Sequence, residues 1–311
     1  MPEGDTLFRA ATVLRRALLN KTVTQFDSSV DLVAGAASRH SIAGRTIHAV
    51  EARGKHLLIV FRDPQDTAAE LIPTPEALKL DLIRSDMVLH THLRMTGSWH
   101  IYRPSEAWRK PAHYAKVVVR TEDFVAPCFS APVVEMLTGR ETARHPQLAA
   151  LGPDAMTEAF DPAEARLRLR RHPDVPLGVA LMNQRLMAGV GNVYKSEVMF
   201  LQRLSPFIPL KELSDEQLDS VIALSHKLMR ANETNGARIT NFSLDTSQRL
   251  WVYGRSGESC RQCGTKIQMR RQGLDGRSTY YCPQCQNVAS FAGNVSSSSA
   301  IEESIEETHE P

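Results

Sequence analysis

The apolar residues near the start of the chain recur at the three-to-four-residue spacing of an amphipathic helix. They are Leu7, Phe8, Ala11, Leu14 and Leu18. Asp5 or Thr6 is suited to cap the N-terminus of this helix, and basic residues lie toward its C-terminal end, where cations suit the helix dipole. We therefore predict one helix that packs its apolar face on the residues that follow.

From residue 22 to about residue 130 the pattern changes to short runs of aliphatic and β-branched residues bounded by turns. These runs are residues 46–50, 56–61, 87–91 and 116–121. They predict a β-sandwich. Residues 63–81 contain Pro and Glu with little periodicity, so we expect an inserted surface loop there.

Helical spacing returns after a linker that ends at residue 153. The expected helices are residues 163–170, 177–187, 193–204 and 216–232. The resulting α+β organisation has five parts along the chain. They are an N-terminal helix and β-sandwich domain (1–140), a linker (141–153), a helical domain (154–245), a cysteine-rich segment (246–290) and a disordered acidic tail (291–311).

Composition and charge narrow the class of protein. Hydrophobic residues make up 42% of the 311 residues, which is ordinary for a globular chain. No apolar run approaches the roughly 20 residues of a membrane helix, and no secretory signal is present, so we expect a soluble, cytoplasmic protein. The net charge is +2, but residues 286–311 carry five Glu and no Lys or Arg, which leaves +7 on the remainder. A positive body favours a polyanionic partner, although many proteins with such a charge bind none.

Four of the five cysteines lie within 26 residues and form two Cys-x-x-Cys pairs separated by 18 residues. They are Cys260, Cys263, Cys282 and Cys285. This spacing predicts one closed, structural zinc site, in preference to two redox pairs or chance clustering. The basic residues between the pairs suit contact with nucleic acid or form a solvated charged face. Cys128 lies in an apolar run and is expected to be a buried, inert thiol.

Residues 2–3 offer a second kind of chemistry. If Met1 is removed, Pro2 has a free secondary amine, which is a nucleophile, and the carboxyl group of Glu3 can exchange protons beside it. The N-terminal end of the predicted helix disfavours an ammonium group, which helps to keep the amine neutral. The alternative is that both residues merely begin and cap the helix.

Two turns could hold anions. Lys55 follows Gly54 between two predicted strands, where a lysine is either a phosphate ligand or a solvated turn residue. Asn192 ends a glycine-rich turn that precedes a helix, which is either an anion site built on the helix N-terminus or a plain corner with a structural cap.

Taken together, these segments resemble the formamidopyrimidine-DNA glycosylase and endonuclease VIII family of bifunctional DNA repair enzymes. The resemblance spans residues 1 to about 290. The matching segments are residues 2–4, 53–55, 183–194 and 252–255, and the cysteine-rich segment with Gly276 and Arg277. It implies an N-terminal helix with a β-sandwich, a helix–two-turn–helix domain and a zinc finger, with damaged double-stranded DNA between the halves and the damaged nucleotide flipped out.

The resemblance also implies roles for single residues. The Pro2 amine would attack C1′ of the sugar to form a Schiff base, Glu3 would transfer protons, and the strand would be cleaved by β- and δ-elimination. Lys55, Asn192 and Arg277 would hold phosphates, and Arg94 and Met95 would fill the gap left by the flipped base. Thr6 stands where the family often has Glu, so a second carboxylate near Glu3 would come from Asp5 or be missing.

The resemblance further implies one structural zinc, no organic cofactor, no membrane and a monomer. Gly4 and residues 129–137 resemble the endonuclease VIII branch, whereas Met95 resembles the wedge of the oxidised-purine branch. We expect oxidised pyrimidines as substrates, with oxidised purines as the alternative. A catalytically silent module that binds damaged DNA is a third possibility, which the presence of Pro2, Glu3 and Lys55 disfavours.

Overall fold

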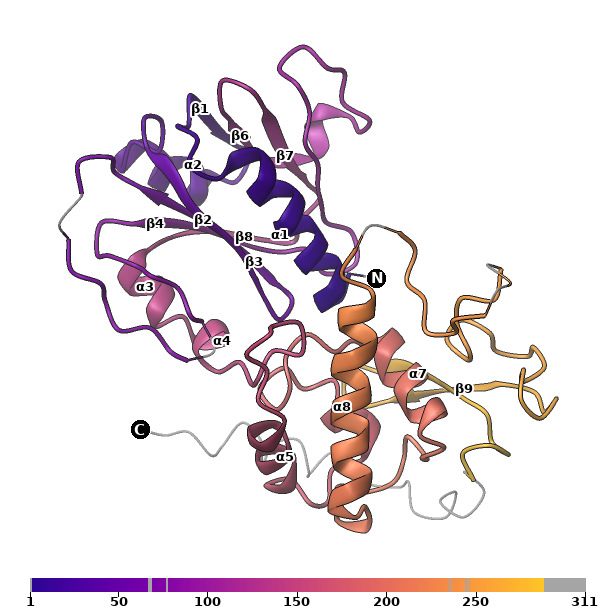
Figure 1. Ribbon diagram of the computed structural model, residues 1–311. Helices are drawn as coiled ribbons and strands as arrows, with labels where there is room; N and C mark the ends of the chain where they lie inside the picture. The colour runs from indigo at the N-terminus through magenta and orange to yellow at the C-terminus, as the bar shows by residue number, and fades with distance from the viewer. Residues whose placement is uncertain are drawn as a thin grey trace. The chain divides into compact units, whose positions relative to one another are not determined.

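The computed structural model describes residues 2–66, 69–76, 78–234, 236–243, 245 and 247–287. The chain divides into two compact units, one that ends at Leu151 and one that begins at Gly152 (Figure 1). The predicted disordered tail, 291–311, lies outside the described residues. None of the helices in the described part is long and apolar enough to cross a membrane.

The first unit begins with helix α1, Gly4–Leu18, which lies along β2 and β3 of a sheet (Figure 1). Its predicted apolar positions Leu7, Ala11, Leu14 and Leu18 are all buried. The expected N-cap at Asp5 or Thr6 is wrong, because the N-cap is Glu3, and Asp5 and Thr6 are the second and third residues of the helix. The carbonyl of Glu3 accepts the first helical hydrogen bonds, while the buried Asp5 carboxylate pairs with Arg9 one turn further on.

Two antiparallel four-stranded sheets enclose the main core of this unit, as the predicted β-sandwich requires. One sheet has the order β1 (Gln25–Ser28), β6 (Ala115–Arg120), β7 (Val125–Phe129) and β5 (Ser98–Trp99). The other has the order β2 (Thr46–Arg53), β3 (His56–Arg62), β4 (Met87–His92) and β8 (Val133–Thr138). Alternate residues of β3 point into the core between the sheets, with α1 and α2 (Asp31–Arg39) packed at its margin.

The described residues of 63–81 form no helix or strand and are mostly exposed, as the predicted surface loop requires, but the end of the loop packs on the second sheet. Leu78 and Leu82 are fully buried. The guanidinium of Arg53 on β2 donates to the carbonyl of Leu78 at 2.7 Å, and that of Arg62 on β3 donates to Asp81 at 2.7 Å. Arginines of the two strands thus bind backbone carbonyls at the end of this loop.

The second unit contains helices α5 (Pro162–Arg170), α6 (Leu177–Ala180), α7 (Asn192–Leu201) and α8 (Asp215–Ala231), and a hairpin of β9 (Gln268–Gln272) and β10 (Arg277–Tyr281). The helix predicted at residues 177–187 ends at Ala180, seven residues short. Polar side chains divert the chain after it. Asn183 accepts a hydrogen bond from the amide of Arg185, and Gln184 bonds the backbone of Gly189 and Val190 across the turn.

A buried carboxylate joins α7 to the segment that leads into the cysteine-rich region. Glu197 has no exposed surface. It accepts backbone hydrogen bonds from Trp251 at 2.8 Å, Val252 at 2.9 Å and Tyr253 at 2.8 Å, and the hydroxyl of Thr240 also donates to it. Three consecutive amides directed at one carboxylate fix the path of residues 251–253.

We expect Glu197→Gln to lower the free energy of unfolding by about 2 kcal/mol, because hydrogen bonds to a charged acceptor are worth more than those to a neutral amide and one amide N–H would meet backbone donors. Urea unfolding measures this change. The matched control is Glu212→Gln, an exposed glutamate of the same unit, which should change stability by less than about 0.5 kcal/mol. Equal effects of the two substitutions would contradict the role assigned to Glu197.

Candidate functional site

The N-terminal candidates lie at the start of α1. Pro2 is half-buried and Glu3 has no exposed surface. Glu3 occupies the N-cap position through its backbone, but its carboxylate makes no capping hydrogen bond to the described helix. The side chain is therefore held at the positive helix end for a reason other than capping.

Asp5 is the second carboxylate next to this end, and it also has no exposed surface. Its Oδ2 lies 3.2 Å from Nη1 of Arg9, and its Oδ1 accepts from the hydroxyl of Thr6 at 3.3 Å. Thr6 therefore helps to bind Asp5 on the first turn. Arg9 thus compensates the charge of Asp5. Glu3, which directly follows Pro2 in the chain, is therefore the stronger candidate for proton transfer.

Lys55 lies in the two-residue turn between β2 and β3, and Arg53 and His56 form the last pair of this hairpin. Gly54 has φ of 56°, in the left-handed region that glycine adopts without strain, and this permits the tight turn. The Lys55 side chain is half-buried, unlike the fully solvated lysine of the alternative interpretation.

Arg94 and Met95 lie in a tight turn directly after β4. The amide of Gly97 donates to the carbonyl of Leu93 at 2.8 Å, and a Cβ on Gly97 would lie 2.8 Å from the Leu93 backbone, so the turn requires glycine. Arg94 has φ of 42° and Met95 is 62% exposed. The turn thus presents a large apolar side chain to solvent, as an inserted wedge requires.

A histidine that the sequence analysis missed connects these two turns. His92 on β4 pairs with His56 on β3, and its Nδ1 accepts a hydrogen bond from the amide of Arg94 at 3.2 Å. Burial and the positive charge of Lys55 lower the pKa of His92 to about 4, so the ring is neutral at pH 7. Strand register therefore brings Lys55 and Arg94 to the same end of the sheet, and the only sequence signal was the spacing of His90 and His92, two residues apart.

In the second unit the structure brings Asn192 and Arg277 together. Asn192 is the first residue of α7 and is 3% exposed, and Gly191 is the N-cap, so the structural-cap alternative for Asn192 is wrong. Its Nδ2 donates to Oγ of Ser278 at 3.0 Å, while its Oδ1 is buried with no hydrogen-bond partner among the described residues. Ser278 follows Arg277 on β10, so the helix N-terminus and the hairpin arginine are neighbours.

Arg277 is half-exposed and forms an ion pair within its own turn. Its Nη2 and Nε lie 3.0 Å and 3.2 Å from Oδ2 of Asp275. Beneath it, the buried Lys195 of α7 donates to the hydroxyl of Thr279 at 2.7 Å and so fixes β10 on the helix. An arriving phosphate would have to replace Asp275 on the guanidinium.

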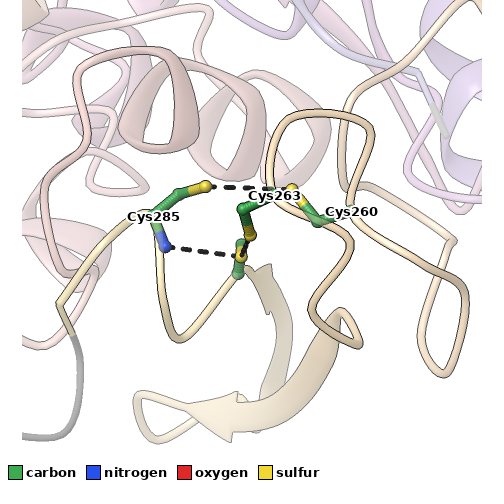
Figure 2. Close-up of side chains that lie close together, drawn as sticks. Cys260, Cys263 and Cys285 are labelled. Atoms are coloured by element: carbon green, nitrogen blue, oxygen red, sulfur yellow. Dashed lines mark hydrogen bonds between the residues drawn. The ribbon is translucent and has the colours of Figure 1, made fainter.

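The four predicted metal ligands converge from two turns (Figure 2). Their sulfur atoms lie within 4.8 Å of one another, with 3.9 Å between Cys260 and Cys285 and 3.4 Å between Cys263 and Cys282. Tetrahedral zinc with Zn–S bonds of about 2.3 Å separates sulfurs by about 3.8 Å, so the cluster fits one zinc ion. All four ligands are thiolates, which makes the site structural and closed.

Cys128 is fully buried outside this cluster, and burial raises the pKa of its thiol.

Three family models match the chain in the order of these features. The formamidopyrimidine-DNA glycosylase N-terminal domain matches residues 1–132, the H2TH domain of the same enzymes matches residues 151–243, and the zinc finger found in FPG and IleRS matches residues 257–288. The chain belongs to the formamidopyrimidine-DNA glycosylase and endonuclease VIII family. It is a DNA glycosylase and AP lyase of base excision repair.

Among its relatives, a probable endonuclease 8 2 of Streptomyces coelicolor is 37% identical over 92% of this chain and 94% of its own length. The DNA-(apurinic or apyrimidinic site) lyase Nei2 of Mycolicibacterium smegmatis is 35% identical over 93% of this chain and all of its own. A solved structure of Fpg from Lactococcus lactis with DNA shares the fold with a TM-score of 0.71 at 21% identity, covering 92% of this chain and 99% of that one.

Removing the negative charge of Asp275 should strengthen DNA binding, because the Arg277 guanidinium would no longer be paired. An exposed ion pair is worth about 0.2–1 kcal/mol, so Asp275→Asn should lower the Kd for an abasic duplex by a factor of about 1.4 to 5. Arg277→Ala should weaken binding and reduce the salt slope by about 1. Fluorescence anisotropy over a range of salt concentrations measures both.

The matched control for this charge is Asp174→Asn, which removes an equally exposed partner of Lys211 in the same unit. It should change the Kd less than Asp275→Asn does. If the two substitutions have the same effect, general charge and not release of Arg277 governs binding.

Proposed function

We propose that this enzyme removes oxidised pyrimidines from double-stranded DNA, with the Pro2 amine as nucleophile, and cleaves the strand by β- and δ-elimination. The observation that carries the proposal is the fully buried Glu3 carboxyl, which follows Pro2 at the helix N-terminus without a capping role. A proton-transfer group held in that way beside a secondary amine suits formation and breakdown of an imine.

In this mechanism the Pro2 nitrogen attacks C1′ of the damaged nucleotide and the bond from C1′ to the base breaks. Glu3 donates a proton to O4′ as the C1′–O4′ bond opens, which leaves an iminium ion between Pro2 and C1′. The iminium withdraws electrons, so C2′ loses a proton and the 3′ phosphate leaves. A second elimination releases the 5′ phosphate, and water hydrolyses the remaining imine.

The other candidate residues would hold the DNA. The half-buried Lys55 would pair with a phosphate beside the damaged nucleotide, as would Arg277 after it leaves Asp275, with Asn192 at the start of α7 beside it. The exposed Met95 would enter the space left by the flipped base, with Arg94 next to it. We further infer that the enzyme acts as a cytoplasmic monomer without an organic cofactor.

The names of relatives that match more than nine-tenths of this chain support the preference for pyrimidines. The relatives at 31–37% identity have names that denote endonuclease 8 or Nei2, whereas the Fpg structures share the fold at about 21% identity. Gly4 at the start of α1 supports the same branch.

Borohydride reduction tests the nucleophile. We expect the enzyme with a free Pro2 amine to form a covalent adduct with an abasic oligonucleotide, and a form that retains Met1 to form none, because its Pro2 nitrogen is an amide. Glu3→Gln should still form the adduct with a preformed abasic site, because its sugar already equilibrates with the open-chain aldehyde, but should lose base removal by about 100-fold or more, because there the ring must be opened with a proton on O4′. Gel electrophoresis and mass spectrometry identify the adduct.

An adduct at full yield with the Met1-retaining form would refute Pro2 as the nucleophile. DNA binding without an adduct for the free amine would instead favour the catalytically silent module.

Duplexes that each contain one defined lesion test the substrate class. We expect kcat/KM for a ring-saturated pyrimidine to exceed that for 8-oxoguanine by about tenfold or more, the discrimination that a differently shaped pocket supplies. An abasic duplex serves as the control, because it bypasses base recognition. A higher value for 8-oxoguanine would assign the enzyme to oxidised purines.

A further inference from the structure

A second cluster of metal-ligating side chains lies in the first unit, away from the four cysteines. His90, Glu135 and His145 each direct one ligand atom into a common space, and these atoms lie within 4.8 Å of one another. From this convergence we propose that the three residues form a second metal site, for a divalent first-row transition ion such as zinc.

Three separate elements build this cluster. His90 on β4 pairs with Glu135 on β8, so the antiparallel register places both side chains on one face of the sheet. His145 arrives from the chain after α3 (Gly139–Ala143), where it is the N-cap of α4 (Pro146–Ala149). A capping box of Thr138 and Glu141 begins α3 and so directs the chain back over the sheet.

The distances suit a small ion with nitrogen and oxygen ligands. Nε2 of His145 lies 3.3 Å from Oε2 of Glu135, and Nδ1 of His90 lies 2.7 Å from the same oxygen. Ligand atoms about 2.0–2.1 Å from tetrahedral zinc are separated by about 3.3 Å. The distance from His90 must therefore lengthen by about 0.6 Å, which the 41% exposed side chain of Glu135 permits.

The surroundings of His90 match those of a metal-bound histidine. Its ring is fully buried, and Nε2 lies 2.8 Å from Nδ1 of His56, so each ring nitrogen faces a different partner. A ligating histidine uses one nitrogen for the ion and donates the other N–H to a neighbour. Glu135 offers a carboxylate oxygen and the two histidines offer imidazole nitrogens, which are ligand types that zinc takes.

Hydrogen bonding alone explains His145 poorly. Its contact with Glu135 is long at 3.3 Å, and its Nδ1 is buried with no hydrogen-bond partner among the described residues. An ion bound at Nε2 of His145 and shared with His90 and Glu135 would hold this ring more firmly than the long contact with Glu135 does. Partial exposure of Glu135 leaves room for water as a further ligand.

The test is the zinc content of the full-length enzyme. Protein saturated with zinc and freed of excess by gel filtration should contain two zinc ions per chain by elemental analysis. Glu135→Gln and His145→Gln should each contain one, and His56→Gln should retain two but bind the second ion about 10–100-fold more weakly in competition with a chromophoric chelator. The matched control is His113→Gln, an exposed histidine of the same unit, which should contain two with unchanged affinity.

One zinc per chain in the wild-type enzyme, or two with unchanged affinity in Glu135→Gln, would overturn the proposal. Circular dichroism shows whether each variant is folded, and Glu135→Gln alters only a partly exposed side chain, so it tests the site even if the histidine variants unfold. None of these measurements depends on glycosylase activity.

Discussion

The buried carboxylate of Glu197 connects helix α7 of the second unit to residues 251–253 and to Thr240. A charged group without exposed surface is costly unless several donors compensate it, and here three successive amides and a hydroxyl do so. Those amides belong to the segment that leads into the cysteine-rich region, so one side chain of α7 sets where that region starts. The zinc site then determines where the β9–β10 hairpin ends.

The position of Arg277 follows from these two restraints. Glu197 fixes residues 251–253 before the hairpin, and the cysteine cluster holds the chain directly after it. Lys195 and Asn192 bind β10 itself. An arginine on a hairpin of only two strands would otherwise be poorly positioned. Helix α7 therefore carries both Glu197, which fixes residues 251–253, and Asn192, the anion-binding candidate. The two residues are about one and a half turns apart.

The sequence predicted the parts of the fold that rest on local pattern and spacing. The period of α1, the strands of the sandwich and the paired cysteines need only neighbouring residues, and the structure contains all three. Two features were not predicted, for different reasons. The helix predicted at 177–187 ends early because Asn183 and Gln184 bond to nearby backbone, a local competition that apolar periodicity does not report. The packing at the end of the predicted surface loop depends on Arg53 and Arg62, whose partners lie 25 and 19 residues away in the sequence, so no short window contains both partners.

The candidate site shows the same division. Lys55 was recognisable from its turn, and Glu3 from its place next to Pro2, because both depend on adjacent residues. His56, His90 and His92 were not, because their significance arises from strand register, which places three histidines of two strands within ring contact. Each is unremarkable in its own strand, where His56 directly follows Lys55, and His90 and His92 lie on either side of Thr91.

Because strand register places His90 against His56, an ion at the proposed metal site would affect the turn that carries Lys55. When Nδ1 of His90 binds an ion, Nε2 must carry the proton and donate it to Nδ1 of His56. His56 then accepts at Nδ1 and carries its own proton on Nε2, the reverse of the arrangement in which His90 donates to Glu135. The bound ion would thus set the tautomer of the residue that follows Lys55, and through the His56–His92 pair its effect would extend to the turn with Arg94 and Met95. A change of tautomer moves no backbone atom, so such coupling would alter the electrostatics at this end of the sheet while leaving its geometry intact.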